Sequence, residues 1–442
     1  MSVERLAVFL AAWLAAASAW AGLDIERWTT PQGARVYFVE NHDLPMLDVS
    51  VTFSAGSARD TAVKSGLANL TRHVMSLGAG DLDEQQIAER LADVGAQMGG
   101  FFDQDRAGFT LRTLSGAAER GPALAVFATV LARPTFPEAV VAREKARAVA
   151  NLNEAATKPE YLGEKAFQSA IYGGHPYALP EAGDPETVAR LTRAELIDFH
   201  ARHYRAANMT VAIMGDIDRA GAEQLAASLA ADLPAGAAPA PLPAVPPLAT
   251  GVEITVPHHA TQSHLFMGQP GMTRDDPDYF PLLVGNYILG GGGFDSRLVE
   301  EIRQKRGLAY SAYSYFVPMR QRGAFQIGLQ TRRDATDEAV RVTRETLQRY
   351  LADGPTEAEL KQARDNLVGS FPLRLDSNRK ILDHLAMMGF YDLPPGWLDD
   401  YTRKVAAVTR EDILRAMRAR LSPETMATVI VGGQIAAETG KK

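Results

Sequence analysis

An internal duplication constrains the fold of this chain more strongly than any other feature of its sequence. Three pairs of segments recur at a single offset of 217 residues, without a gap: residues 191–196 with 408–413, residues 209–213 with 426–430, and Gly215 with Gly432. Repeats that stack into solenoids are far shorter, about 20 to 50 residues. The sequence therefore predicts two copies of one domain.

A segment rich in proline and alanine separates the two copies. Residues 234–250 contain six prolines and six alanines, and proline at this density excludes a helix interior or a central strand. We interpret the segment as an extended, semi-rigid linker. It divides an N-terminal domain at residues 22–233 from a C-terminal domain at residues 251–442.

Hydrophobic periodicity predicts strands and helices in both domains. Strands are expected near residues 34–40, 47–54, 106–113, 209–214, 252–256, 262–268, 308–316, 323–330 and 426–431. The predicted strands cluster, and the predicted helices form longer runs between the clusters. This order favours an α+β fold in which each domain is a mostly antiparallel sheet covered by helices.

The N-terminal 21 residues differ from the rest of the chain. Arg5 precedes an apolar run at residues 6–17, and Ala19-Trp20-Ala21 offers small residues at a cleavage site. This pattern predicts a secretory signal peptide, because the run is too short to cross a bilayer. No later stretch reaches 18 apolar residues, so we expect an exported, periplasmic protein with no membrane span after signal removal.

Composition excludes several kinds of chemistry. The 442 residues include no cysteine, which rules out disulfides, thiolate catalysis and cysteine-built metal sites. The formal net charge is −7 and no basic run is present. An acidic surface argues against nucleic acid as a partner.

The stretch from residue 290 to 316 carries the first candidate site. Four glycines at 290–293 precede a predicted helix at 296–306, which Gly307 ends before a strand. On that strand, alternation predicts that Tyr310 and Ala312 share one face. Arg303 lies at the edge of the apolar face of the helix, so Arg303 and Tyr310 could converge on one carbonyl or oxyanion. The alternative is an arginine that snorkels to solvent and a tyrosine that belongs to the core.

A second stretch, at residues 55–80, adds a family resemblance. Together with the first stretch it resembles the pitrilysin or insulinase family of zinc metallopeptidases, the inverzincins, which carry H-x-x-E-H on a helix. The resemblance covers essentially the whole chain after residue 21. Its landmarks are Gly-Leu-Ala at 66–68, His-Pro-Tyr at 175–177, Ser-Arg-Leu at 296–298 and Arg-Gly-Leu-Ala-Tyr at 306–310. It implies two homologous domains arranged as a clamshell.

The chain departs from the family at the zinc motif. Where the family has two zinc-binding histidines and a general-base glutamate, this sequence has Asn69, Arg72 and His73. The position of the third ligand falls at about Asn151, with Glu154 close by. Asparagine is a poor zinc ligand, and Arg72 would place a permanent cation where catalysis needs a carboxylate. We therefore expect these positions to be a degenerate zinc motif and this chain to bind no metal.

The resemblance assigns a different role to the second half. In the family, an arginine and a tyrosine reach across to the zinc site and stabilise the oxyanion, and Arg303 and Tyr310 match them. Such donors typically contribute about 3 to 4 kcal/mol each to catalysis. The resemblance thus implies a chain that is inactive alone. It would form a heterodimer with a homologous subunit that carries H-x-x-E-H and zinc, and would act on peptides or unfolded polypeptides.

Two alternatives remain at the level of sequence. The chain could be a peptide-binding or assembly scaffold without any part in proteolysis. It could also be an active peptidase with remodelled ligands, either His73 with Glu154 or the pair His200 and His203, which have i, i+3 spacing on a predicted helix.

Other candidate residues carry weaker signals. His258, His259 and His264 are expected to be surface or sheet residues, because no carboxylate is spaced to join them. Residues 99–102, Gly-Gly-Phe-Phe, resemble the place where catalytic halves of the family present a strand edge to the peptide. In this copy, packing alone would explain them.

Overall fold

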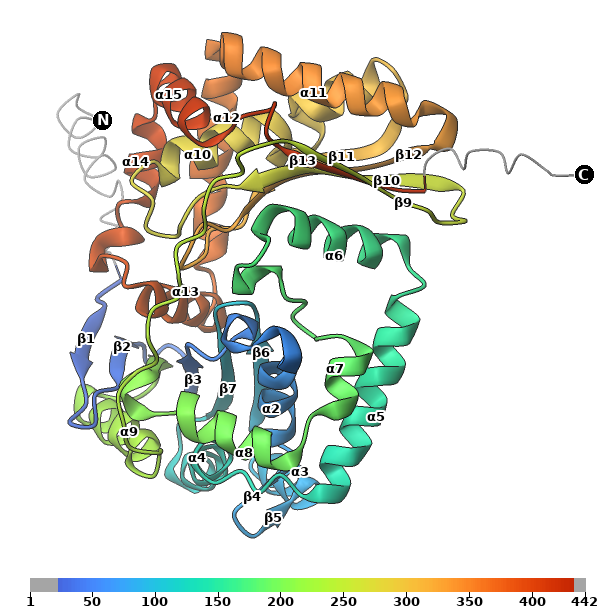
Figure 1. Cartoon of the computed structure of the whole chain (residues 1–442). Coiled ribbons are helices and arrows are strands. Elements are labelled where there is room, and N and C mark those ends of the chain that lie inside the picture. The colour runs from blue at the N-terminus through green and yellow to red at the C-terminus, as the bar shows by residue number, and fades with distance from the viewer. Residues whose placement is uncertain (1–22, 433–442) are drawn as a thin grey trace, which may run out of the picture.

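The computed structural model describes residues 23–432, so the predicted signal peptide at 1–21 lies outside the described residues. Two β-sheets form on either side of residues 234–250 (Figure 1). Each sheet is mixed but mostly antiparallel and is covered by helices, which confirms the predicted α+β class. No helix within residues 23–432 is long and apolar enough to span a membrane.

The N-terminal sheet has six strands in the order β1-β2-β8-β3-β7-β6. They are β1 (Glu26–Thr29), β2 (Arg35–Glu40), β3 (Met46–Phe53), β6 (Gln97–Phe102), β7 (Ala107–Leu114) and β8 (Met209–Gly215). Only the β2–β8 pairing is parallel. Strands β4 (Gly78–Ala79) and β5 (Leu82–Asp83) form a separate small hairpin.

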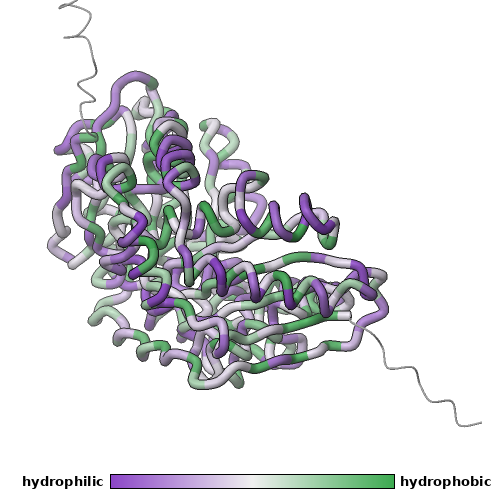
Figure 2. The backbone as a smooth tube through the Cα atoms, turned by 90° about the horizontal axis from the view of Figure 1, so that it is seen from above, coloured by the Kyte–Doolittle hydropathy of each residue, from purple (hydrophilic) through white to green (hydrophobic). Residues whose placement is uncertain are grey.

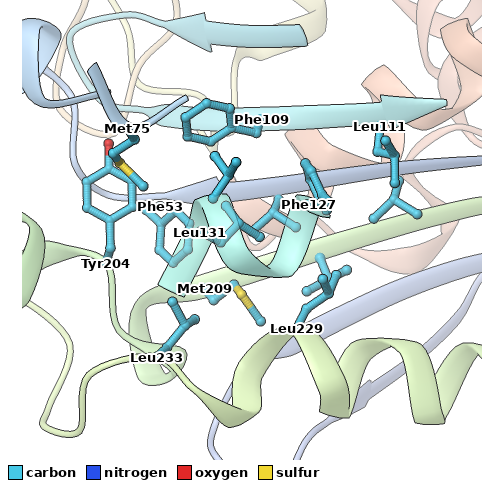
Figure 3. Close-up of a cluster of buried hydrophobic side chains, with 14 of the residues drawn as sticks. Phe53, Met75, Phe109, Leu111, Phe127, Leu131, Tyr204, Met209, Leu229 and Leu233 are labelled. Atoms are coloured by element: carbon cyan, nitrogen blue, oxygen red, sulfur yellow. The ribbon is translucent and has the colours of Figure 1, made fainter. Parts of the chain in front are cut away.

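Eight helices belong to the described part of this domain. They are α2 (Leu67–Met75), α3 (Glu84–Asp93), α4 (Ala117–Ala132), α5 (Glu138–Ala155), α6 (Pro159–Tyr172), α7 (Pro185–Arg190), α8 (Arg193–His203) and α9 (Arg219–Ala231). Helices α2, α4 and α9 pack on one face of the sheet. Figure 3 shows the resulting core, in which Met75 from α2 lies beside Tyr204, with Phe109 from β7 and Phe127 from α4 nearby.

The C-terminal sheet has five strands in the order β11-β12-β10-β13-β9. They are β9 (Val252–Val256), β10 (Gln262–Pro270), β11 (Ala309–Phe316), β12 (Ala324–Arg332) and β13 (Ala427–Val431). The helices are α10 (Tyr279–Asn286), α11 (Thr336–Asp353), α12 (Glu357–Ser370), α13 (Asn378–Tyr391), α14 (Tyr401–Ala407) and α15 (Arg410–Arg420). In Figure 2, many helices carry both purple, hydrophilic residues and green, hydrophobic residues. This mixture is typical of helices that bury one side against a sheet.

The duplication predicted from sequence is visible in the structure. Helices α8 and α15 span equivalent residues at the 217-residue offset, and each begins with a capping box, at Thr192 and Thr409. Gly215 and Gly432 both have positive φ, +133° and +102°. Strand β8 ends at Gly215 and strand β13 ends just before Gly432. Each of these strands forms the single parallel pair of its sheet, β8 with β2 and β13 with β9.

Each domain also covers part of the other domain's sheet. Helix α13 of the C-terminal domain packs against β8, β3 and β2, whereas α6 of the N-terminal domain packs against β10 and β13 (Figure 1). The buried carboxylate of Asp105 joins the domains further, because it accepts hydrogen bonds from the Tyr391 hydroxyl at 3.0 Å and the Arg320 backbone N–H at 2.7 Å. The two halves are therefore joined directly as well as through the linker.

The linker lies in the seam between the domains. Residues 234–250 contain no helix or strand. Its carbonyl oxygens bond to side chains of both domains: Ala240 accepts from Arg59 at 2.6 Å, Leu242 accepts from Gln321 at 3.2 Å, and the Pro243 oxygen lies 2.9 Å from His175 Nε2. These contacts satisfy hydrogen-bond acceptors of the linker backbone, which forms no helix or strand of its own.

Candidate active site

Helix α2 carries Asn69, Arg72 and His73, the positions at which the sequence predicts a degenerate zinc motif. The carboxylate of Asp60 begins this helix by accepting hydrogen bonds from the backbone N–H groups of Gly66 and Ala68, at 2.8 and 2.9 Å. Burial raises the pKa of Asp60 to about 7. Because Asn69 and His73 are four residues apart, they lie on the same side of the helix, away from the buried face that includes Met75.

Asn69 and His73 line a cavity of about 400 Å³ together with Asn151 from α5. Leu70, Leu152 and Val188 supply apolar lining, and Tyr161 from α6 lies on the same cavity. Three of the four degenerate positions therefore meet in space. The fourth, Arg72, is not part of the lining.

Arg72 packs over the sheet instead. Its guanidinium lies 5.9 Å from the ring centroid of Phe109, and a Cβ added to Gly100 would lie only 2.2 Å from Arg72 Nη1. Burial lowers the pKa of Arg72, and its Nε has no hydrogen-bond partner in the described chain. The side chain of Arg72 thus lies against the edge strand, where the lack of a side chain at Gly100 leaves room for it.

The cavity holds a buried carboxylate that the sequence analysis missed. Glu144 is 2% exposed, and its Oε2 lies 3.0 Å from His73 Nε2. Arg143 and Arg147 also donate to Glu144, at 2.6 and 3.1 Å. Burial acts to raise the pKa of Glu144, but the contacts with His73, Arg143 and Arg147 outweigh it and lower the pKa. The available signal was the spacing of seven residues between Glu144 and Asn151, which places both on one side of a helix.

These residues do not fit a zinc ion. Two of the cavity's polar groups, Asn69 and Asn151, are neutral amides, and His73 is engaged by Glu144. Arg147 brings a cation into the same cavity. Within residues 23–432, no group of three or more His, Asp or Glu side chains is placed to hold a metal ion.

The remodelled ligand sets considered above are not assembled either. Glu154 pairs with Lys158 at 2.9 Å and is not in the cavity lining. The Nε2 atom of His200 lies 2.8 Å from the Leu131 carbonyl oxygen, whereas the ring of His203 packs at a tilt against Phe199 with centroids 4.3 Å apart. Burial lowers the pKa of His203 to about 4.

The three histidines around the start of β10 were expected to be surface or sheet residues. His258 Nε2 lies 3.0 Å from the Thr157 carbonyl oxygen, and the buried ring of His264 in β10 lies 3.5 Å from Glu160. His259 precedes β10, as expected of a residue near the start of that strand.

Arg303 and Tyr310 come together on the C-terminal domain. The guanidinium carbon of Arg303 lies 4.5 Å from the ring centroid of Tyr310, and 4.7 Å from that of Phe294. Tyr310 is 81% exposed, so it is not a core residue. Tyr310 is thus presented to solvent on edge strand β11, and Arg303 lies half-buried in the segment before it.

The backbone that presents this pair is irregular. The predicted helix at 296–306 is a π-helix at Val299–Gln304 preceded by a short 3₁₀ turn at Gly293–Asp295. The pairing of β11 with β12 shifts register between Ala309 and Ala312, and both alanines are buried while Tyr310 points outward. The predicted alternation of Tyr310 and Ala312 on one face is therefore wrong, because the irregular register reorients the tyrosine.

Arg303 has unused hydrogen-bonding capacity. It makes no hydrogen bond or ion pair with residues 23–432, whereas nearby Lys305 and Arg306 both pair with Glu301, at 2.7 Å. Hydrogen bonding to Lys305, Arg306 and Arg349 lowers the pKa of Glu301 to about 2. With Glu301 occupied by other cations, the guanidinium N–H groups of Arg303 remain able to bind an external acceptor.

Comparison with known proteins agrees with this architecture. Residues 35–184 match the family described as Insulinase (Peptidase family M16), and residues 190–367 match the Peptidase M16 inactive domain. A crystal structure of a peptidase M16 inactive domain from Pseudomonas fluorescens is 38% identical, with a TM-score of 0.89, and the match covers 94% of this chain and 99% of that chain. The chain belongs to the M16 peptidase family.

Several M16 relatives are named as zinc proteases. An uncharacterized zinc protease of Bacillus subtilis is 25% identical over 361 residues, 80% of this chain and 85% of that protein. One from Mycobacterium tuberculosis is 27% identical over 416 residues, 93% of this chain and 94% of that protein. The periplasmic protease PqqL of Escherichia coli shares the fold at 16% identity and a TM-score of 0.78, over 93% of this chain and 46% of that chain.

Proposed function

We propose that this M16 chain is the non-catalytic subunit of an exported zinc metalloendopeptidase. It would pair with a homologue that carries intact H-x-x-E-H and would present Arg303 and Tyr310 to the zinc site of that partner. The observation that carries the proposal is the contact between Arg303 and the exposed ring of Tyr310. The guanidinium N–H groups of Arg303 meanwhile lack hydrogen-bond partners in the described chain.

The two halves of this chain support that division of roles. The cavity that contains Asn69, His73 and Asn151 includes neither Arg303 nor Tyr310 in its lining. The residues of that cavity do not fit a zinc ion, whereas Tyr310 is exposed beside a half-buried Arg303. Donor groups without a metal site of their own are useful if another chain supplies the metal site.

In the proposed complex, zinc on the partner would polarise the scissile carbonyl and activate water. Arg303 and the hydroxyl of Tyr310 would donate hydrogen bonds to the carbonyl oxygen as negative charge develops on it. Their contribution is electrostatic, and it is greatest when the donors are already oriented before the reaction. The substrate would be a peptide or unfolded polypeptide. The composition of residues 1–21, which is typical of a signal peptide, supports a periplasmic location for the proposed complex.

Reconstitution tests the proposal. The purified chain is added to a homologous H-x-x-E-H subunit, and cleavage of a fluorogenic peptide is measured. We expect stimulation by the wild type, and a loss of about 100-fold or more in kcat with Arg303→Ala or Tyr310→Phe. Matched controls are Tyr313→Phe on the same strand and Arg332→Ala on the next strand, which should stimulate normally. Equal stimulation by all four variants would refute the assigned role.

A peptide-binding scaffold is the second candidate, and the cavity beside Asn69 and Asn151 favours it. Its signature would be tight binding of peptides by the isolated chain without stimulation of any H-x-x-E-H subunit. Filling the cavity with Ala148→Trp should then weaken peptide binding, whereas Arg303→Ala should not.

A further inference from the structure

Phe294 is a large apolar side chain with no place in the core. It belongs to the 3₁₀ turn at Gly293–Asp295 and is 66% exposed. An isolated exposed apolar residue is common and needs no explanation. Phe294 is unusual because its ring centroid lies 4.7 Å from the guanidinium carbon of Arg303, nearly the same distance as the ring of Tyr310.

The turn that carries Phe294 is anchored on several sides. The Gln304 side chain donates to the Phe294 carbonyl oxygen at 3.1 Å, which ties the turn to the π-helix containing Arg303. Ser296 Oγ donates to the Gly293 oxygen at 2.7 Å, and Gln362 from α12 donates to Asp295 at 2.9 Å. Gly293, with φ +64°, allows the sharp entry into the turn. The position of Phe294 is thus supported by the fold.

The Arg303 side chain, in contrast, has the rings of Phe294 and Tyr310 as its main contacts. Its neighbours Lys305 and Arg306 are ordered by ion pairs with Glu301, but Arg303 has no such pair within residues 23–432. A long arginine side chain loses considerable rotamer entropy when it is fixed. Two aromatic rings near one guanidinium restrict its motion through cation–π contacts without using its N–H donors.

We propose that Phe294 is a positioning residue for the donor pair. Together with Tyr310 it orders the Arg303 guanidinium, so that the N–H groups are already oriented when a carbonyl or oxyanion arrives. This inference rests on the proposed function for its catalytic consequence. The ordering itself, however, is a property of the isolated chain and can be measured without a partner.

The first test uses the full chain alone. The arginine side chains are labelled with ¹⁵N, and the Nε–H resonance of Arg303 is assigned by its loss in Arg303→Lys. We expect Phe294→Ala to lower the order parameter of this group and to remove part of its ring-current shift, whereas Leu373→Ala, at another exposed apolar residue, should change neither. An unchanged order parameter in Phe294→Ala would overturn the proposal.

The second test uses the reconstituted peptidase. Phe294→Ala is expected to lower the stimulated kcat by about two- to fivefold, the effect of one exposed cation–π contact, with little change in KM. Phe294→Tyr should restore the rate because it keeps the ring, whereas Phe294→Leu should not. Equal rates for the leucine and tyrosine variants would contradict a role for the ring.

The two proposals fail in different ways. If the wild-type chain does not stimulate any H-x-x-E-H subunit, the proposed function fails, while the order parameter still decides the role of Phe294. If Arg303→Ala abolishes stimulation but Phe294→Ala changes neither kcat nor the order parameter, the proposed function stands and the positioning role is refuted.

Discussion

The Nε2 atom of His73 lies 3.0 Å from the Oε2 atom of Glu144. His73 is therefore bound to a buried carboxylate that Arg143 and Arg147 also contact. Arg147 is part of the cavity lining as well. These contacts lower the pKa of Glu144 and so keep this buried acidic group ionised.

Placing two zinc-ligand side chains beside His73 should create a metal site. The double substitution Asn69→His with Asn151→Glu would return an imidazole and a carboxylate to the cavity that already contains His73. We expect about one zinc per chain, bound at least tenfold more tightly than by the wild type, as measured by calorimetry and by metal content after dialysis. Adding His73→Ala to the double variant should remove the gain. Stoichiometric zinc in the wild-type protein would contradict this account.

Removing the donor pair should leave the fold intact. Tyr310 is 81% exposed, and Arg303 makes no ion pair in the described part of the chain. Substitutions at exposed positions usually change stability by less than about 0.5 kcal/mol. Arg303→Ala and Tyr310→Phe should therefore each shift the thermal midpoint by no more than about 2 °C. Phe325→Ala, at a fully buried residue of β12, should cost about 3 to 5 kcal/mol and provides the positive control.

Two helix glycines should respond in opposite directions to alanine. A Cβ at Gly163 of α6 would lie 2.2 Å from the ring of Phe266 in the other domain, whereas nothing lies within 4 Å of a Cβ at Gly369 of α12. Overpacking costs about 1 to 3 kcal/mol, which exceeds the helix preference for alanine of up to about 1 kcal/mol. Gly163→Ala should lower the free energy of unfolding and Gly369→Ala should raise it by about 0.5 kcal/mol. Chemical denaturation measures both changes. If Gly163→Ala were also stabilising, α6 could not be tightly packed on the second sheet.

Acid should weaken the segment that precedes the donor pair. Arg297 donates two hydrogen bonds of 2.7 Å to Glu359. Burial acts to raise the pKa of Glu359, but Arg297 and the N–H of Thr356 outweigh it and lower the pKa to about 2. Because the folded pKa is below the ordinary value, this carboxylate stabilises the fold above pH ~4.5, and the stabilisation is lost as the pH falls towards ~2.

After allowance for solvent screening, the contribution of Glu359 at neutral pH should be about 1 to 2 kcal/mol. Urea unfolding at pH 7 and pH 3 would measure it. Glu359→Gln should lower stability at pH 7 and reduce the difference between the two pH values. An identical pH dependence in wild type and variant would show that Glu359 titrates normally in the folded protein.

Much of the secondary structure followed from local patterns. The sequence predicts helices near residues 117–132, 138–155, 193–203 and 410–420, and these ranges coincide with α4, α5, α8 and α15. Helices α8 and α15 each begin with a capping box. Strand β1 and helix α7, of four and six residues, were not predicted, because such short elements have too few positions to show a period. The π-helix at Val299–Gln304 looks like an ordinary helix in sequence, because its backbone depends on how it packs.

The sequence by itself determined which chemical groups this chain can offer. The amides at Asn69 and Asn151, the duplication, and the presence of Arg303 and Tyr310 could all be read from residue identity and spacing. Tertiary structure alone decided where the charges lie. Arg72 lies over Gly100, and a register shift turns Tyr310 outward. Glu144 contacts His73, Arg143 and Arg147. The physical reason is that burial and pairing of a charged or aromatic side chain depend on neighbours far away in sequence, which local periodicity does not encode.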